Sequence, residues 1–372
     1  MVNGWHSNAP RGQDWTRRAL LSWAALLPLR AESVKGRLLP SQRSRYLDPS
    51  TDFLLYRLTD PSYASYLPAR HSRVASRRDS FLLFSSERTG SLQAFRMDQR
   101  TGDWEQLTQA EALDPSSLVL MPDESSFCYF DSSSLRQVIL ATLREKEVYR
   151  TPDGWTRAPG LTVSPDGSRA AMIESRPGTF RLRLIKLRRG AAATPVEGSA
   201  ALSDPVPQPR RERILYRQGA NSLFVVSYDG RQKRPLPLAP GGVGPAFWSP
   251  DGRTLLYLHY PEEKGKLHSI REYSLDASSD QLLAPTSQFV DFQTNANATV
   301  FVGASENLAS PYVLLLLRST RRELTLCEHG ASHPSRVAPV FSPDSQRIYF
   351  QSDRHGRPAI YCIPVDKLVE PT

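Results

Sequence analysis

Short runs of apolar or alternating residues recur along this chain, and polar turns separate them. Residues 254–258 and 347–351 are two such runs, each directly after a polar turn, and residues 358–363 form a further run after a loop. Gly, Pro and Asp bound most of these runs. Runs of four to eight residues between turn-forming residues are typical of β-strands, so the pattern predicts a chain built almost entirely of short strands.

The polar turn itself recurs seven times. It reads Ser-Pro-Asp-Gly at 164–167 and 249–252 and Ser-Pro-Asp-Ser at 342–345, and weaker copies begin at residues 76, 121, 208 and 293. Successive copies lie 41 to 49 residues apart. A period in the forties with several strands per unit indicates the blades of a β-propeller. We therefore predict an all-β fold, a seven-bladed β-propeller.

The ring of blades also needs a closure. The last repeat ends near Val365 and has room for only three strands, whereas residues 53–58 form a strand-like run ahead of the first turn. We expect this N-terminal strand to be the outer strand of the last blade, since closure removes an exposed sheet edge. The predicted organisation is a signal-peptide-like segment at 1–31, a linker at 32–47 and the propeller at 48–372.

The N-terminal segment resembles an export signal. Arg17-Arg18 precedes an apolar stretch of eleven residues, 19–29, which is shorter than the roughly 20 residues of a membrane span but fits a signal-peptide core. Residues 16–21 resemble a twin-arginine signal. The segment predicts a periplasmic or secreted protein without a transmembrane span. The alternative is an amphipathic N-terminal helix on a cytoplasmic protein.

The charge balance favours an anionic ligand. The net charge is +9, and forty of the 47 basic residues are arginine, whose planar fork matches carboxylate and phosphate groups. The alternative is that these arginines are spread over a solvated surface. No paired Cys/His zinc spacing and no aromatic RNA-binding motif occurs, so we expect no nucleic acid.

Cys128, Cys327 and Cys362 are predicted to be free buried thiols, and the protein is expected to be a monomer.

Three stretches resemble the oligogalacturonate lyase family, whose members are seven-bladed propellers that cleave short pectin fragments. They are Asp-Pro-Ser-Thr-Asp at 48–52 running into Arg-Leu-Thr at 57–59, Ala-Phe-Trp-Ser-Pro-Asp-Gly at 246–252, and the strand pair at 350–361. The resemblance spans about residues 45–365 and is partly shared with TolB-type propellers.

The resemblance implies functional histidines that this chain does not match. The family's base would fall at Pro245, its sixth-blade metal ligand in the stretch 288–291, and its seventh-blade ligands at Arg336-Val337-Ala338. Manganese is expected for the family, but with these ligands missing we predict no metal cofactor here. β-Elimination beside a uronate requires a base and a neutralised carboxylate, so orthodox lyase activity is not expected.

Other residues are candidates for the funnel at the centre of the ring. Their position before each turn predicts that Arg70 and Arg336, from adjacent blades, form an anion clamp, with Asp204 and Gln288 contacting sugar hydroxyls. The alternative is that these arginines are rim residues or ion-pair partners. An arginine can also replace the electrostatic role of a metal; an altered lyase would then use His71 or His333 as its base, and for both the alternative is a plain surface histidine.

Two functions follow, and the sequence leaves open whether the protein is an enzyme. The first is an exported lyase-like propeller that binds an acidic oligosaccharide, a pectin-derived uronate, with altered or lost β-elimination. The second is a TolB-like, non-catalytic propeller that binds another protein of the cell envelope. A propeller of the prolyl oligopeptidase type is not supported, since no Gly-x-Ser-x-Gly nucleophile motif is present.

Overall fold

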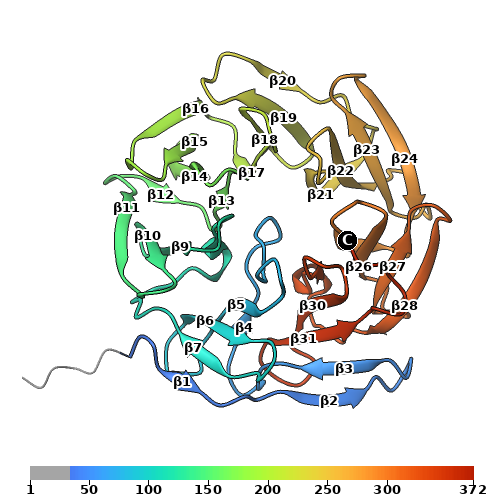
Figure 1. The fold of residues 1–372 in the computed structure, drawn as a ribbon. Coiled ribbons are helices and arrows are strands. Elements are labelled where there is room, and N and C mark those ends of the chain that lie inside the picture. The colour runs from blue at the N-terminus through green and yellow to red at the C-terminus, as the bar shows by residue number, and fades with distance from the viewer. Residues whose placement is uncertain (1–33) are drawn as a thin grey trace, which may run out of the picture. The chain divides into compact units, whose positions relative to one another are not determined.

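The part of the chain that the structure describes folds into seven small sheets arranged in a ring (Figure 1). The computed structural model describes residues 34–372. Within this range each sheet has four or five antiparallel strands, and helical structure is confined to two 3₁₀ turns, η1 (Pro115–Ser117) and η2 (Pro334–Arg336). The predicted all-β, seven-bladed propeller is confirmed.

The first four blades take residues 65–235, with one strand added from further upstream. From the centre outward, blade 1 consists of β4 (Ser65–Tyr66), β5 (Phe81–Ser86), β6 (Gln93–Asp98), β7 (Trp104–Gln106) and β1 (Leu38–Leu39), and blade 2 consists of β8 (Val119–Leu120), β9 (Ser126–Asp131), β10 (Ser134–Ile139) and β11 (Glu145–Arg150). Blade 3 consists of β13 (Thr162–Val163), β14 (Arg169–Arg176), β15 (Thr179–Lys186) and β16 (Ala192–Gly198), and β12 (Thr156–Arg157) also pairs with β14. Blade 4 consists of β17 (Leu202–Pro207), β18 (Arg213–Gln218), β19 (Ser222–Ser227) and β20 (Lys233–Pro235).

The last three blades complete the ring, and blade 7 takes its outer strands from the N-terminal side of the propeller. Their strands are β21 (Gly242–Trp248), β22 (Thr254–Tyr260), β23 (Ser269–Ser274) and β24 (Ser279–Pro285) in blade 5; β25 (Phe289–Thr294), β26 (Val300–Ser305), β27 (Tyr312–Leu317) and β28 (Arg322–Glu328) in blade 6; and β29 (Val340–Phe341), β30 (Arg347–Ser352), β31 (Ala359–Pro364), β3 (Leu54–Arg57) and β2 (Ser44–Leu47) in blade 7.

The repeated turn has one backbone hydrogen bond in common in all seven blades. The N–H of its first residue donates to the carbonyl five residues later at 2.8–3.0 Å in all seven copies, which begin at residues 76, 121, 164, 208, 249, 295 and 342. The copy in blade 6 thus begins at Asn295, two residues after the predicted start at Gln293. There the fourth residue is Ala298 with φ 56°, the left-handed conformation that glycine supplies at Gly167 and Gly252.

The ring closes through the N-terminal strand, as the sequence predicts. Strand β3 pairs with β31 in blade 7, and β2 adds a fifth strand outside it. Residues 38–47, assigned to the linker from the sequence, instead contain β1 and β2. The predicted signal-peptide-like segment at 1–31 lies outside the described residues, and within 34–372 no helix is long and apolar enough to span a bilayer.

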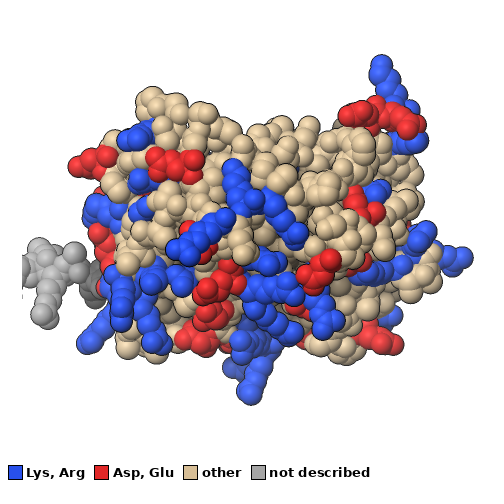
Figure 2. All heavy atoms as spheres, turned by 90° about the horizontal axis from the view of Figure 1, so that it is seen from above, with Lys and Arg blue, Asp and Glu red and all other residues tan. Residues whose placement is uncertain are grey.

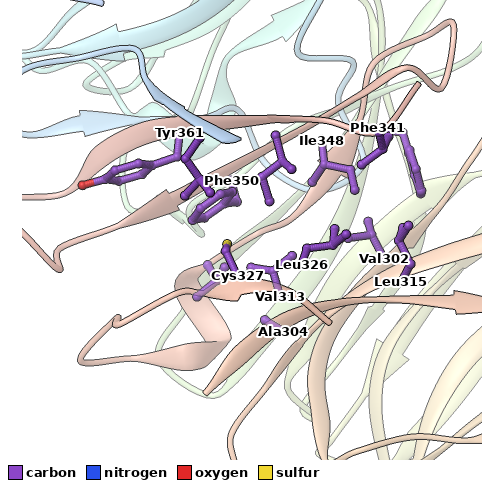
Figure 3. Close-up of a cluster of buried hydrophobic side chains, with 14 of the residues drawn as sticks. Val302, Ala304, Val313, Leu315, Leu326, Cys327, Phe341, Ile348, Phe350 and Tyr361 are labelled. Atoms are coloured by element: carbon purple, nitrogen blue, oxygen red, sulfur yellow. The ribbon is translucent and has the colours of Figure 1, made fainter. Parts of the chain in front are cut away.

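Seven apolar clusters hold the ring together, one between each pair of neighbouring blades. Figure 3 shows the cluster in which Val302 and Leu315 of blade 6 face Ile348 and Phe350 of blade 7. Cys327 is a buried free thiol in this cluster, and Cys128 and Cys362 are buried and free as well. Every blade therefore buries both of its faces against its neighbours, which is how a propeller removes apolar surface from water.

A buried polar contact joins the first and last blades. Tyr349 of β30 donates its hydroxyl to Asp79 in the blade 1 turn at 2.9 Å, and Arg347 forms an ion pair with the same carboxylate. Burial raises the pKa of Asp79, and the bonds from Tyr349 and Arg347 act in the opposite direction. The blades that meet at the ring closure thus share a specific contact in addition to their apolar cluster.

Candidate functional site

The inner strand of blade 1 is interrupted, and this interruption shapes the centre of the molecule. Tyr66 pairs with Ser85 and Ala75 pairs with Leu82, so eight residues on the inner strand face only two on β5. The extra residues leave the sheet as a central loop, residues 67–74. Figure 1 shows this segment, between β4 and β5, reaching into the middle of the ring.

The central loop is fixed to three other blades. The N–H of Leu67 donates to Gln351 Oε1 of blade 7 at 2.9 Å, and the carbonyl of Arg70 accepts from Gln293 Nε2 of blade 6 at 2.5 Å. Arg73 forms an ion pair with Glu124 of blade 2 at 3.0 Å. Because these contacts come from three different blades, the loop is held in place at the centre of the ring.

A cavity of about 510 Å³ lies at the mouth of the ring, opposite the repeated turns, and residues of blades 1, 2, 3, 4, 6 and 7 line it. A smaller cavity of about 210 Å³ lies nearer the turns, against Pro165, Pro209 and Trp248. Arg70 and His71 line both cavities. The central loop therefore forms the floor of the larger cavity and places two of the predicted site residues there.

Arg70 is held by a carboxylate that the sequence analysis did not single out. Its Nε and Nη2 lie 2.9 and 2.8 Å from Oδ1 of Asp291 on β25, whose side chain is only 2% exposed. Burial raises the pKa of Asp291, while the charge of Arg70 opposes that rise. In the sequence, the signal for this residue is an aspartate between two aromatic residues, Phe289 and Phe292, on an inner strand. A charge buried in such a place needs a partner of opposite charge.

Arg336 has the opposite surroundings. It ends the short turn η2, lines the same cavity and is exposed. Its guanidinium has no hydrogen bond or ion pair with any residue between 34 and 372. Only its backbone is bonded: the N–H donates to the carbonyl of His333 at 2.9 Å, and the carbonyl accepts from Gln351 at 2.7 Å. Arg70 and Arg336 therefore present one paired and one available guanidinium to a single cavity.

Positive charge alone does not mark this site. Lys and Arg side chains also cover much of the outer surface seen in Figure 2, with Asp and Glu among them. Among the surface ion pairs of residues 34–372, Arg150 pairs with Glu147 and Arg357 pairs with Glu87. What distinguishes the cavity is that arginines from two adjacent blades, Arg70 and Arg336, line one concave space.

His71 lines the cavity floor next to Arg70. Burial lowers its pKa to about 3, the charge of Arg70 acts in the same direction, and Asp204 acts against both. The imidazole is therefore neutral at neutral pH. A neutral imidazole has a free acceptor nitrogen, but one with so low a pKa is a weak proton acceptor.

The remaining predicted residues divide between the cavity and its surroundings. Asp204 lines the cavity, and its carboxylate accepts from Arg217 Nε at 3.1 Å. Gln288 lies in the link between β24 and β25, and His333 is exposed at the start of η2; neither lines the cavity. The structure thus gathers Arg70, His71, Asp204 and Arg336, and it leaves Gln288 and His333 outside.

Solved structures with the same fold include two oligogalacturonate lyases. One, an oligogalacturonate lyase in complex with manganese, superposes with a TM-score of 0.84 at 22% identity. The other, from Vibrio parahaemolyticus, gives 0.83 at 20% identity. Both comparisons cover 89% of this chain and 98% of the solved chain. The propeller architecture is therefore shared over nearly the whole of the described range.

The side chains at the cavity do not form a set of metal ligands. Asp291 is the carboxylate that blade 6 contributes, and its Oδ1 already accepts from Arg70. Blade 7 contributes Ser335, Arg336, Ala338 and Gln351 to the lining. The side-chain oxygen of Gln351 already accepts from the N–H of Leu67, and Arg336 would repel a cation. Across residues 34–372, no three His, Cys, Asp or Glu side chains gather in a group suited to a metal ion. This donor set does not fit manganese.

Two relatives of this amino-acid sequence are also oligogalacturonate lyases by name. The sequence is 22% identical over 387 residues to an oligogalacturonide lyase of Pectobacterium atrosepticum and 24% identical over 389 residues to an oligogalacturonate lyase of Dickeya dadantii. Both alignments cover 89% of this chain and 98% of the relative. No family model matches the chain. Sequence and structure together show that this protein is homologous to oligogalacturonate lyases and shares their seven-bladed propeller fold.

Proposed function

We propose that the protein binds a short acidic oligosaccharide in the cavity at the mouth of the ring, and that it does so without a metal ion. The observation that carries this proposal is the meeting of Arg70 and Arg336, from adjacent blades, in one cavity of about 510 Å³. A cavity of this size accommodates a small ligand. The homologues of this protein are named for activity on galacturonate oligomers, which carry a carboxylate on every sugar unit.

The two arginines have different tasks in this proposal. Arg336 is available, so it forms the charge-assisted bond to the sugar carboxylate. Arg70 keeps N–H groups beyond the two that bond Asp291, and Asp291 fixes the direction in which they point. Because Asp291 neutralises Arg70, the pair together with Arg336 carries one net positive charge, which matches one carboxylate. Asp204, opposite them in blade 4, is placed to accept from a sugar hydroxyl.

We further propose that β-elimination is altered or lost. The reaction removes the weakly acidic proton at C5 of a uronate, and an effective base has a pKa near the working pH. His71 is the one histidine among the residues lining this cavity, and its pKa of about 3 makes it a weak base. The positive charge of the arginines can stabilise a carboxylate, but it does not supply a base.

The place of action is proposed from the N-terminal sequence. Arg17-Arg18 followed by the apolar stretch 19–29 supports export to the periplasm or beyond. Replacing Arg17 and Arg18 by lysine should leave the protein in the cytoplasmic fraction if the twin-arginine route is used. Equal amounts of both forms in the periplasmic fraction would contradict this route.

Calorimetry and absorbance test binding and catalysis separately. Titration of the protein with digalacturonate in the presence of a chelator should give saturable binding that weakens as salt is added. Ultraviolet absorbance should show little unsaturated product, with or without manganese. Absence of digalacturonate binding both with the chelator and with manganese would overturn the proposed ligand. Rapid product formation that requires manganese would overturn the proposed loss of metal-dependent activity.

A further inference from the structure

One side of the cavity is uncharged. Among the described lining residues, blades 2 and 3 contribute no Asp, Glu, Lys, Arg or His. In the ring order, blades 6 and 7 face blades 2 and 3 across the axis, so this side lies opposite Asp291 and Arg336. We call it the apolar wall, and it consists of Pro115, Ser116, Ala158, Pro159, Gly160 and Leu161.

The hydroxyl groups on this side point their hydrogens into the protein. Ser116 Oγ donates to Asp114 Oδ1 at 2.5 Å, and Thr162 Oγ1, next to the wall, donates to the carbonyl of Pro205 at 2.6 Å. Met172 and Ile173 of blade 3, which are 1% and 3% exposed, add apolar atoms to the cavity lining on this side. A sugar hydroxyl placed here would give up hydrogen bonds to water for few in return, which is unfavourable.

A single carboxylate holds the two loops of the wall in place. Asp114 accepts from the N–H of Ser116 at 2.9 Å, from the N–H of Gly160 at 3.2 Å and from Arg157 Nη1 at 2.6 Å. The Asp114 and Arg157 side chains are only 10% and 16% exposed. The guanidinium of Arg157 also stacks on Phe130 at 4.6 Å. The wall is therefore built before a ligand arrives, and Asp114 is its positioning residue.

We propose that the ligand is a uronate that carries a small apolar substituent, an O-acetyl or O-methyl ether group, and that this substituent packs on the apolar wall. The inference rests on the proposed function, since it needs the free carboxylate to lie at Arg336 and Arg70. With the carboxylate there, the groups on the far side of the sugar ring face blades 2 and 3, which lie across the axis. A methyl group in place of a hydroxyl hydrogen removes a donor and adds apolar contact.

The test compares three ligands by calorimetry in the presence of a chelator: digalacturonate, its O-acetylated form and its O-methyl ether. Replacing the hydrogen of a poorly bonded hydroxyl by a group that buries a methyl should tighten binding about ten-fold. The two substituted forms separate an ester from an ether as the natural substituent. Equal affinity for all three ligands would overturn the inference while leaving the proposed function intact. No binding of any ligand would overturn both.

Variants locate the effect on the wall. Ala158→Ser adds a hydroxyl to the wall and should reduce the preference for substituted ligands at least about three-fold. Asp114→Asn weakens the hold on both loops and should reduce the same ratio of affinities, a quantity that a loss of overall stability alone would not change. Asp229→Asn, in an exposed turn of blade 4, is the matched control and should retain the full ratio. An unchanged ratio in both Ala158→Ser and Asp114→Asn would overturn the assignment of the preference to this wall.

Discussion

Arg336 and Arg70 differ in what surrounds them, and this difference defines what each can do. An exposed arginine without a partner can bind a ligand at little cost to the fold, whereas an arginine paired with a buried aspartate supports the fold as well. This contrast cannot be seen in the sequence pattern, because both residues occupy the same position before a repeated turn. The contrast leads to separate predictions for the two residues.

Replacing Arg336 by glutamine should weaken digalacturonate binding about 10- to 100-fold with almost no change in stability. One charge-assisted bond is lost, and such bonds contribute roughly 1.5–3 kcal/mol. Arg253→Gln, which removes an arginine that is 79% exposed in the blade 5 turn, changes the net charge equally and should bind as the wild type does. Similar losses in both variants would indicate a general charge effect and contradict a specific contact.

Replacing Arg70 by methionine should destabilise the protein by about 3 kcal/mol, because the buried carboxylate of Asp291 loses its partner. The double variant Arg70→Met with Asp291→Asn removes both charges and should regain much of that stability. Denaturant unfolding measures both. If the single and double variants are equally destabilised, the ion pair is not what holds the central loop.

His71 should make stability depend on pH. Its pKa in the folded protein is about 3, below the ordinary value of 6.5, so the unfolded chain binds more protons between these values. The free energy of unfolding should therefore fall as the pH is lowered from 6.5, by about 1–2 kcal/mol at pH 5. In His71→Gln this part of the dependence should disappear. A wild-type curve that is flat from pH 6.5 to 5 would show that the imidazole is not held neutral.

At the scale of the strand and turn, the repeated motif explains why the fold was predictable. Two of the three clear copies place glycine where the chain needs positive φ, as at Gly252 with φ 73°, and this chemistry can be read directly from sequence. In blade 6 the same conformation is held by Ala298, which carries no such signal, and the predicted turn was placed two residues early.

The central loop is the part of the fold that the sequence pattern does not announce. Residues 67–74 occupy the place of an inner strand, and the excess of eight residues over two becomes visible only when β4 and β5 are paired. Arg70 could be placed near the funnel from its position before the turn. Its partner Asp291 could not be identified in this way, because the two residues belong to different blades and lie 221 positions apart in the sequence.

The turn geometry itself can be tested with a matched pair of glycines. A Cβ at Gly252 would lie 2.7 Å from the carbonyl oxygen of Pro209, whereas one at Gly178 would meet nothing within 4 Å, and both residues have φ near 70°. Gly178→Ala should cost about 1 kcal/mol from the backbone conformation alone. Gly252→Ala should cost roughly 1 kcal/mol more, as measured by thermal unfolding. Equal costs would indicate that the neighbouring turns are not in close contact.

For the molecule as a whole, the ring brings residues from distant repeats into one cavity. The sequence period alone identified seven blades, since each blade buries its faces only against its neighbours. The chemistry of the cavity needs the closed ring, because blades 1, 6 and 7 meet there only after β3 has joined β31. The protein thus shares the propeller fold of the oligogalacturonate lyases. Its own cavity is lined by arginines and by a weakly basic imidazole.

The most direct measurement is a crystal structure of the protein grown with digalacturonate and manganese together. We predict that a sugar carboxylate lies within hydrogen-bonding distance of Arg336 and faces Arg70, while Asp291 keeps its contact with Arg70 and no manganese occupies the cavity. A manganese ion bound between blades 6 and 7, or a sugar bound away from both arginines, would contradict the account.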